Sequence, residues 1–454
     1  MPSPHFHILG AGNVGSLIGA GLRSTVPPAY VTFIMRSQER LQQYAQHDST
    51  VRIASSTLGP ERVVERKIPA IYGHPVLRSG GPEMISNLIV TTKGTQTDKA
   101  IEAVLPSIHK ATNILLLQNG MGMYEKLCEK FWPNPSARPT FFLGITTHGV
   151  HNTPVPFSYN HAGHGKLQIS QIPNTVRDLH IEPGTYTASE AAVRSDGMDD
   201  VIPGPSPRAK NLQFPTDSEE SVKADYSGEI KFPREHNAPG VKPDAMESPF
   251  PTDAEEAAKA DYATDPPQDP ATTYPHPGDI PHELLRCGPL LNTEVLPYPE
   301  FLLAQYDKLI VNACVNPLTA ILGCKNKELL ENPAAENMIK AVVQECSKIL
   351  RLHAEEKFNP DTMYLVSTSL DPKRLIGMVR EVVSINGENT TSMLADVNAG
   401  RETELKYIND FLVDIASKHG YKALLNRQLA DLVRTRGSLI RKGVNDCAPL
   451  VNES

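Results

Sequence analysis

Residues 6–15 decide the fold of this chain, and they read FHILGAGNVG. A short, mostly apolar strand, residues 6–9, is followed by Gly10, Gly12 and Gly15 in the spacing G-x-G-x-x-G. In dinucleotide-binding folds the first glycine makes a tight turn, the second lets the backbone approach a pyrophosphate, and the third lets the helix pack on the strand. We therefore predict a strand–turn–helix unit that binds a dinucleotide. A glycine-rich helix start that only packs closely is the alternative.

The residues after the second predicted strand, 30–35, indicate which dinucleotide binds. NAD-specific sites place an acidic side chain at this point to meet the ribose 2′-hydroxyl. This chain has Arg36 and Ser37 instead, and a guanidinium beside a hydroxyl suits a 2′-phosphate. The sequence therefore favours NADPH over NADH, with a solvated surface arginine as the alternative.

Polar residues follow two of the later strands. Strands are predicted at residues 86–92, 113–117, 141–148 and 166–170. Lys93 and Gln96 come after the first of these strands, and Asn119 comes after the second. Because open α/β sheets bind ligands at the carboxyl ends of their strands, these side chains are candidates for the site.

Histidine and cysteine patterns give no metal signature. His148, His161 and His164 have no acidic or cysteine ligand nearby in the sequence, so we interpret them as loop histidines and predict no metal site. The six cysteines are scattered without a CxxC pair, as expected of reduced thiols in an intracellular protein.

Composition excludes several partner classes. The chain has 454 residues, enough for two or three domains, and a net charge of −8, which favours neither nucleic acid nor an anionic membrane. No apolar run approaches the roughly 18–20 residues of a membrane span. The first strand begins so near the N-terminus that no signal or transit peptide is expected, so we predict a cytoplasmic location.

The apolar pattern stops over residues 173–279, where Pro, acidic residues, Ser and Ala dominate. Such a segment buries too little surface to offset its ordering entropy, so we predict a disordered insertion. It contains a repeat, residues 214–226 and 250–262, which is either a motif that binds an unknown protein or, as we favour, a tandem duplication in an unconstrained loop. A helix at 281–286 and a strand at 293–296 then complete the sheet.

The remainder of the chain, from residue 299, is predicted to be helical. Predicted helices cover residues 300–322, 333–355, 371–383, 387–397, 402–418 and 425–441. Lys308, Asn312 and Asn316 recur every fourth residue in an apolar run, so they drift only about 40° per step and share one stripe of a buried helix. The stripe is either a functional site or a structural stripe satisfied by neighbouring backbone. Pro317 is expected to bend or restart this helix.

These motifs together resemble the ketopantoate reductase (2-dehydropantoate 2-reductase) family. The resemblance rests on the glycine motif, Lys93 with Gln96, the run Asn-Gly-Met-Gly at 119–122, the lysine–asparagine–asparagine helix followed by Pro-Leu-Thr, Ser-Met-Leu at 392–394, and Glu404 with Tyr-Ile-Asn at 407–409. It omits only the insertion. It implies an α/β Rossmann domain over 1–172 and 280–298, an all-α domain over 299–454, and a site in the cleft between them.

The resemblance also implies roles for individual residues. Lys308 would be the general acid, and Glu404 would orient the lysine and the substrate. The alternative explanation for Glu404 is that a glutamate in the first turn of a predicted helix interacts favourably with the helix dipole. Asn312, Asn316 and Ser392 would hold substrate, and Asn119 would lie near both substrate and nicotinamide. The implied NADPH-binding residues are Gly10, Ala11, Gly12, Asn13, Val14, Gly15, Arg36, Lys93, Gln96 and Asn119.

The implied activity is reduction of ketopantoate to pantoate, for coenzyme A synthesis, with NADPH as hydride donor. Two alternatives remain: a reductase of another 2-keto acid, and a non-catalytic NADPH-binding scaffold whose insertion recruits a protein. The partners expected are therefore a small 2-keto acid and NADPH/NADP+, with a homodimer as one assembly to test.

Overall fold

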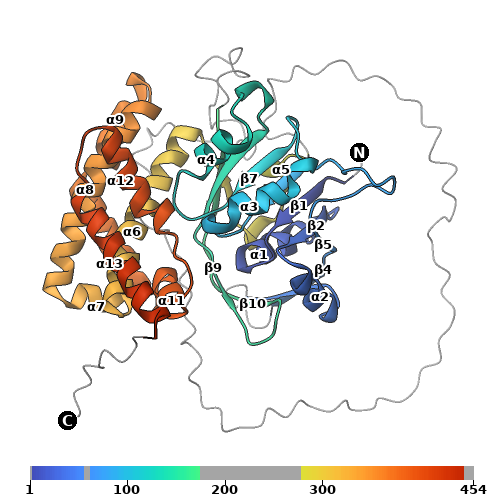
Figure 1. Cartoon of the computed structure of the whole chain (residues 1–454), viewed down its shortest axis with the longest axis horizontal. Coiled ribbons are helices and arrows are strands. Elements are labelled where there is room, and N and C mark those ends of the chain that lie inside the picture. Colours follow the sequence, from blue (N-terminus) through green and yellow to red (C-terminus); the bar gives the residue numbers. More distant parts are fainter. Residues whose placement is uncertain (1–2, 56–61, 174–277, 444–454) are drawn as a thin grey trace, which may run out of the picture. The chain divides into compact units, whose positions relative to one another are not determined.

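A computed structural model describes residues 3–55, 62–173 and 278–443. The predicted insertion at 173–279 lies almost wholly outside these residues, as does its repeat. Figure 1 shows an α/β region built by the first part of the chain and a group of helices built by the last part. Across the three described ranges, no helix has the length and apolarity needed to cross a membrane.

An eight-stranded sheet forms the centre of the α/β region. Its strand order is β12-β11-β8-β7-β6-β1-β2-β5, and all neighbours pair in parallel except β11 with β8. The strands are β1 His5–Leu9, β2 Tyr30–Met35, β5 Ala70–Tyr72, β6 Asn87–Val90, β7 Asn113–Leu116, β8 Thr140–Thr146, β11 Leu167–Gln171 and β12 Thr293–Val295. The chain that follows the insertion thus supplies an edge strand.

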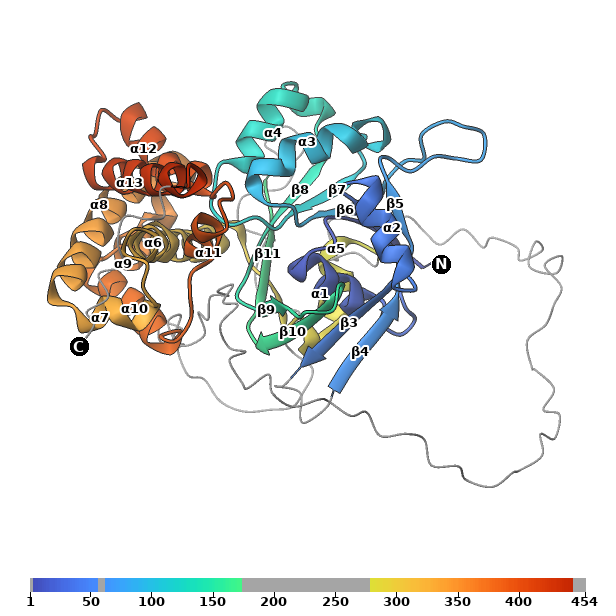
Figure 2. The same ribbon diagram turned by 60° about the horizontal axis from the view of Figure 1, so that its bottom comes forward.

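Helices cover both faces of this sheet, which explains why its central strands are apolar throughout. Ile89 and Leu115 pack in one core with α1 and α5, whereas their neighbours Leu88 and Leu116 point to the opposite core, with α3 and α4. Figure 2 shows the two helix layers on either side of the strands. The helices of this region are α1 Asn13–Leu22, α2 Gln38–Gln46, α3 Gly94–Val104, α4 Met123–Phe131 and α5 Ile280–Arg286.

A second, four-stranded sheet packs against α1 and was not predicted from the sequence. Its order is β4-β3-β10-β9, with strands β3 Thr50–Ser55, β4 Arg62–Lys67, β9 Gly149–Asn152 and β10 Ser158–Gly163. The strand predicted at 141–148 therefore ends at Thr146, and the chain turns into β9, which belongs to the other sheet.

The C-terminal region is helical, as predicted. Its helices are α6 Tyr298–Leu322, α7 Asn326–Glu331, α8 Pro333–Lys357, α9 Met363–Ser369, α10 Pro372–Ile385, α11 Ser392–Asn398, α12 Asn409–Lys418 and α13 Leu424–Arg441. Helix α6 is buried from residue 305 to residue 320 and contacts α8, α10, α11 and α13. It is the central helix of this region.

Pro317 does not restart α6, which was one of the two outcomes predicted from the sequence. A proline inside a helix removes the hydrogen bond to the carbonyl four residues earlier, here that of Ala313. Nδ2 of the buried Asn409 donates to this carbonyl at 2.9 Å, so the oxygen is satisfied from a different segment. The helix consequently continues to Leu322.

Two other helices start later than predicted. The Thr391 hydroxyl accepts a hydrogen bond from the Leu394 N–H, which caps α11 and sets its start at Ser392. The predicted helix at 402–418 is a short 3₁₀ turn, Leu405–Tyr407, followed by α12 from Asn409. Glu404 precedes that turn and is not in the first turn of an α-helix.

Candidate active site

The glycine motif has the geometry of a phosphate-binding turn. A Cβ atom on Gly15 would lie 2.0 Å from the Gly10 carbonyl oxygen, so the close contact between turn and helix requires glycine there. A Cβ atom on Gly12 would meet no atom within 4 Å. Helix α1 begins at Asn13 without a side-chain cap, which leaves first-turn N–H groups available. These features fit the pyrophosphate of a dinucleotide.

The other residues of the motif hold the turn in place. Nδ2 of Asn13 donates to the Val150 carbonyl at 2.7 Å, and the Tyr159 hydroxyl donates to the Ala11 carbonyl at 3.1 Å. Val14, in the first turn of α1, is partly buried and packs against the hydrophobic core between α1 and the strands. The second sheet, which contains Val150 and Tyr159, therefore supports the glycine turn.

The predicted cofactor residues beyond the turn have different surroundings. Arg36 is exposed directly after β2, whereas Ser37 caps α2 by accepting from the Arg40 N–H at 3.2 Å. Lys93 Nζ contacts both carboxylate oxygens of Asp396, on α11, at 2.7 and 2.8 Å. Gln96 is exposed on α3. Lys93 thus ties the α/β region to the helical region, a role that its sequence position did not indicate.

A pocket of about 460 Å³, counted with its open mouth, gathers Lys308 and the four residues predicted to bind substrate. Three of them, Lys308, Asn312 and Asn316, come from α6. Asn119 reaches the pocket from the segment after β7, and Ser392 from the first position of α11. The remaining lining residues are Val311, Val315, Asn326, Val382, Val383, Asn386 and Thr391.

Sequence reasoning missed three polar lining residues. Asn386 follows α10, Thr391 caps α11, and Asn326 opens α7, a helix that was not predicted. The Asn326 side chain donates to the Asn386 carbonyl at 2.9 Å, while its Oδ1 is buried without a partner among the described residues. Only Thr391, a capping residue directly before Ser392, carried a usable sequence signal.

Lys308 is the buried cation of the pocket. Its Nζ donates to the carbonyl of Thr146, at the end of β8, at 2.9 Å. Burial lowers the pKa of Lys308 to about 8, and the nearby Glu404 carboxylate opposes that shift. The amine is therefore mostly protonated at neutral pH, yet acidic enough to donate a proton.

Glu404 lies outside the pocket lining but contacts it. Its carboxylate accepts from Asn119 Nδ2 at 3.1 Å and from the Gly94 N–H at 3.4 Å. Burial raises the pKa of Glu404, and these two hydrogen bonds oppose the shift. The Tyr407 carbonyl, which accepts from the Met121 N–H at 2.8 Å, anchors the same segment. These contacts, rather than a helix dipole, account for the position of Glu404.

The interpretation of the three histidines as loop residues holds for His148 and His164, which lie between strands, and is wrong for His161. His161 lies in β10, and both it and His148 are buried. Burial lowers the pKa of His148 to about 4 and that of His161 to about 3, so both rings are neutral near pH 7.

Comparison with known proteins now identifies the family. The family model described as ketopantoate reductase PanE/ApbA matches residues 6–174, and its C-terminal counterpart matches residues 300–437. The chain belongs to the ketopantoate reductase family. The two matches correspond to the α/β and helical regions, and they omit most of the insertion.

Curated relatives match nearly the whole chain. A probable 2-dehydropantoate 2-reductase of Schizosaccharomyces pombe is 27% identical, over 96% of this chain and 97% of the relative. The 2-dehydropantoate 2-reductase of Saccharomyces cerevisiae is 26% identical, over 97% of each. The cytochrome B translational activator CBS2 of Saccharomyces cerevisiae is 22% identical, over 92% of this chain and 90% of the relative.

Solved structures share the fold. The ternary structure of D-mandelate dehydrogenase with NADH and anilino(oxo)acetate has a TM-score of 0.59 and 20% identity, and covers 96% of this chain and 99% of that one. This ketopantoate reductase family member therefore shares its fold with D-mandelate dehydrogenase.

Proposed function

We propose that this chain reduces 2-dehydropantoate to pantoate, with NADPH as the hydride donor. The observation that carries the proposal is the buried Lys308 amine in a pocket that also contains asparagine and serine side chains. A ketone that accepts a hydride develops negative charge on oxygen, and a positioned ammonium both stabilises this charge and supplies the proton. NADPH supplies the hydride when bound, so the chain needs no covalent nucleophile.

The pocket offers apolar side chains and polar side chains that suit the apolar and polar groups of 2-dehydropantoate. Val311, Val315, Val382 and Val383 offer an apolar surface to the two methyl groups of 2-dehydropantoate. Amide and hydroxyl groups are available for its carboxylate and its terminal hydroxyl, namely those of Asn312, Asn316 and Ser392 and the unpartnered oxygen of Asn326. In this assignment Lys308 faces the keto oxygen. Asn119 orients the substrate, and the Glu404 carboxylate holds the Asn119 side chain by a hydrogen bond.

Two alternatives are distinguished by these contacts. A reductase of another branched 2-keto acid would use the same lysine and valines but would not need the extra polar groups near Asn326 and Asn386. A non-catalytic scaffold, the class that the name of the CBS2 relative suggests, would have no use for a buried amine in an open pocket. The complete polar set therefore favours 2-dehydropantoate reduction.

A substrate panel tests the proposal. NADPH oxidation is followed with 2-dehydropantoate, with its analogue that lacks the terminal hydroxyl, and with pyruvate. We expect kcat/KM to fall at least about 100-fold when the hydroxyl is absent, because the buried groups that bind it are left unpaired. Equal rates with all three acids would support a general 2-keto acid reductase, and no oxidation with any of them would support the scaffold.

The cofactor preference gives a separate prediction for Arg36. Arg36→Ala is expected to raise KM for NADPH about tenfold, because one charge-assisted contact to the 2′-phosphate is lost, and to leave KM for NADH unchanged. Steady-state kinetics with both cofactors measure this, with Arg78→Ala, at an exposed position, as the matched control. A parallel change for both cofactors would contradict the assignment of Arg36 to the 2′-phosphate.

A further inference from the structure

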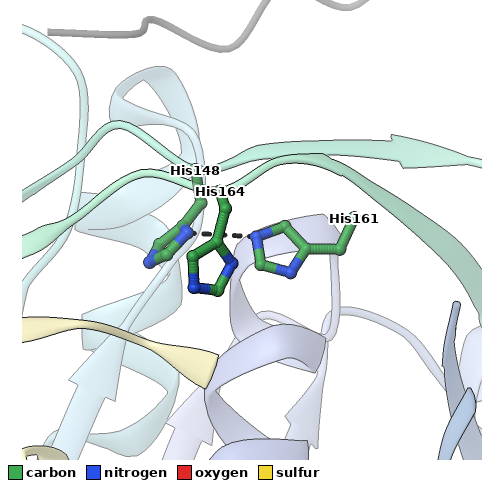
Figure 3. A group of neighbouring side chains, drawn as sticks. All are labelled: His148, His161 and His164. Carbon is green, nitrogen blue, oxygen red and sulfur yellow. Dashed lines mark hydrogen bonds between the residues drawn. The ribbon is translucent and has the colours of Figure 1, made fainter. Parts of the chain in front are cut away.

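Three histidines from separate elements converge beside the end of β8 (Figure 3). His148 follows β8, His161 lies in β10, and His164 lies between β10 and β11. One ring nitrogen of each lies within 4.8 Å of the other two, and His148 Nδ1 is 3.0 Å from His161 Nε2. None of the three lines the substrate pocket.

The hydrogen bonds of His148 determine which of its ring nitrogens has a free lone pair to bind a metal ion. Its Nε2 is 2.7 Å from the Leu291 carbonyl, which can only accept, so Nε2 carries the hydrogen and Nδ1 presents a lone pair to the cluster. A backbone carbonyl on the outer ring nitrogen is the usual support of a metal-binding histidine. The Nδ1 atoms of His161 and His164 are buried and have no partner among the described residues.

We propose that His148, His161 and His164 form a site for a divalent cation of the zinc type. Neutral imidazoles are ligands that Zn²⁺ prefers, and three of them leave a fourth position for water. Two nitrogens on one tetrahedral zinc ion lie roughly 3.3 Å apart, so the His148–His161 pair needs to separate only slightly. His164 is partly exposed and provides access from solvent.

The competing explanation is a hydrogen-bonded histidine cluster without a metal ion. In such a cluster two N–H donors compete for one acceptor nitrogen. His161 Nε2 and the Gly165 N–H, at 3.0 and 3.1 Å, both approach the same lone pair on His148 Nδ1. A bound ion would take this lone pair, and the proton of His161 would move to its unpartnered Nδ1. The ion displaces two hydrogen bonds to His148 Nδ1, those from His161 and from Gly165, and gains three coordinate bonds.

The backbone holds the three rings together without an ion. A Cβ atom on Gly165 would lie 2.3 Å from the Thr147 carbonyl oxygen, so only glycine permits this approach. Lys166 N donates to Thr147 Oγ1 at 2.8 Å, and Thr147 N donates to the Lys166 carbonyl at 2.9 Å. The cluster thus fastens the segment after β8, where the Thr146 carbonyl receives the Lys308 amine.

The test is metal binding by the full chain after treatment with a chelator and its removal. We expect one Zn²⁺ per chain by elemental analysis, and a tetrahedral Co²⁺ absorption spectrum when cobalt is added instead. His164→Ala should weaken Zn²⁺ binding more than about 100-fold, since loss of an outer-shell partner alone costs up to that much. His151→Ala, on β9 and outside the cluster, is the matched control and should bind normally.

A second variant separates ligand loss from misfolding. His164→Cys should retain the ion and add a thiolate charge-transfer band to the Co²⁺ spectrum, because cysteine is also a zinc ligand. Absence of stoichiometric Zn²⁺ binding by the wild-type chain would overturn the proposal. Equal Zn²⁺ affinity of the wild type and of a folded His164→Ala variant would overturn it as well.

Discussion

Lys308→Met is expected to lower kcat for 2-dehydropantoate reduction by about 10²–10⁴-fold while NADPH binding stays normal. The amine is the only cation among the described residues that line the pocket, so its loss leaves the developing alkoxide without charge stabilisation and without a proton donor. Methionine keeps an apolar stem of similar length inside α6, which limits the cavity that alanine would create. Steady-state kinetics and a fluorescence titration with NADPH measure the two effects.

Controls make the Lys308 result specific. The variant should unfold at a temperature close to that of the wild type, because the substitution removes a buried charge and keeps the side-chain volume. Lys99→Met, at an exposed position of α3, should leave kcat unchanged. A Lys308→Met enzyme with near-normal turnover would remove the general-acid assignment.

Glu404→Gln is expected to shift the pH dependence of kcat/KM. The pKa of Lys308 is about 8, and the acid must be protonated, so activity of the wild type should fall as pH rises through about 8. Glu404 raises the pKa of Lys308, so removing its charge lowers this pKa and the fall should occur about one pH unit earlier. At pH 8 the variant should therefore be several-fold slower than it is at pH 6.

Glutamine preserves the hydrogen bond that Asn119 donates, so this variant isolates the charge from the geometry. Exposed Glu402→Gln, two residues away, is the matched control and should keep the wild-type pH profile. A Glu404→Gln profile that is lower at every pH but unshifted would assign Glu404 to substrate orientation alone.

The parts of the fold that were predictable depend on local patterns. The glycine motif, the parallel strands and the lysine–asparagine stripe of α6 are all encoded within about 20 residues, where spacing specifies which side chains share a face. The second sheet was missed because β10 pairs with β3, a strand roughly a hundred residues earlier in the chain. No local signal reports such a pairing.

The same reason separates the predicted from the missed site residues. Lys308, Asn312 and Asn316 share one helix, so their proximity followed from helical geometry. The pocket also contains Asn326 and Asn386, whose positions depend on how α7 and α10 pack. The continuation of α6 through Pro317 likewise depends on Asn409, a tertiary partner that compensates for a locally unfavourable residue.

In the proposed reaction the Lys308 amine protonates the keto oxygen of a substrate held in the α6 pocket. A crystal structure of the chain with NADP+ and pantoate tests it most directly. We expect Lys308 Nζ within about 2.6–3.2 Å of the new hydroxyl oxygen, with the carboxylate of pantoate among the pocket asparagines. Pantoate bound elsewhere, or an amine that still contacts only the Thr146 carbonyl, would contradict it.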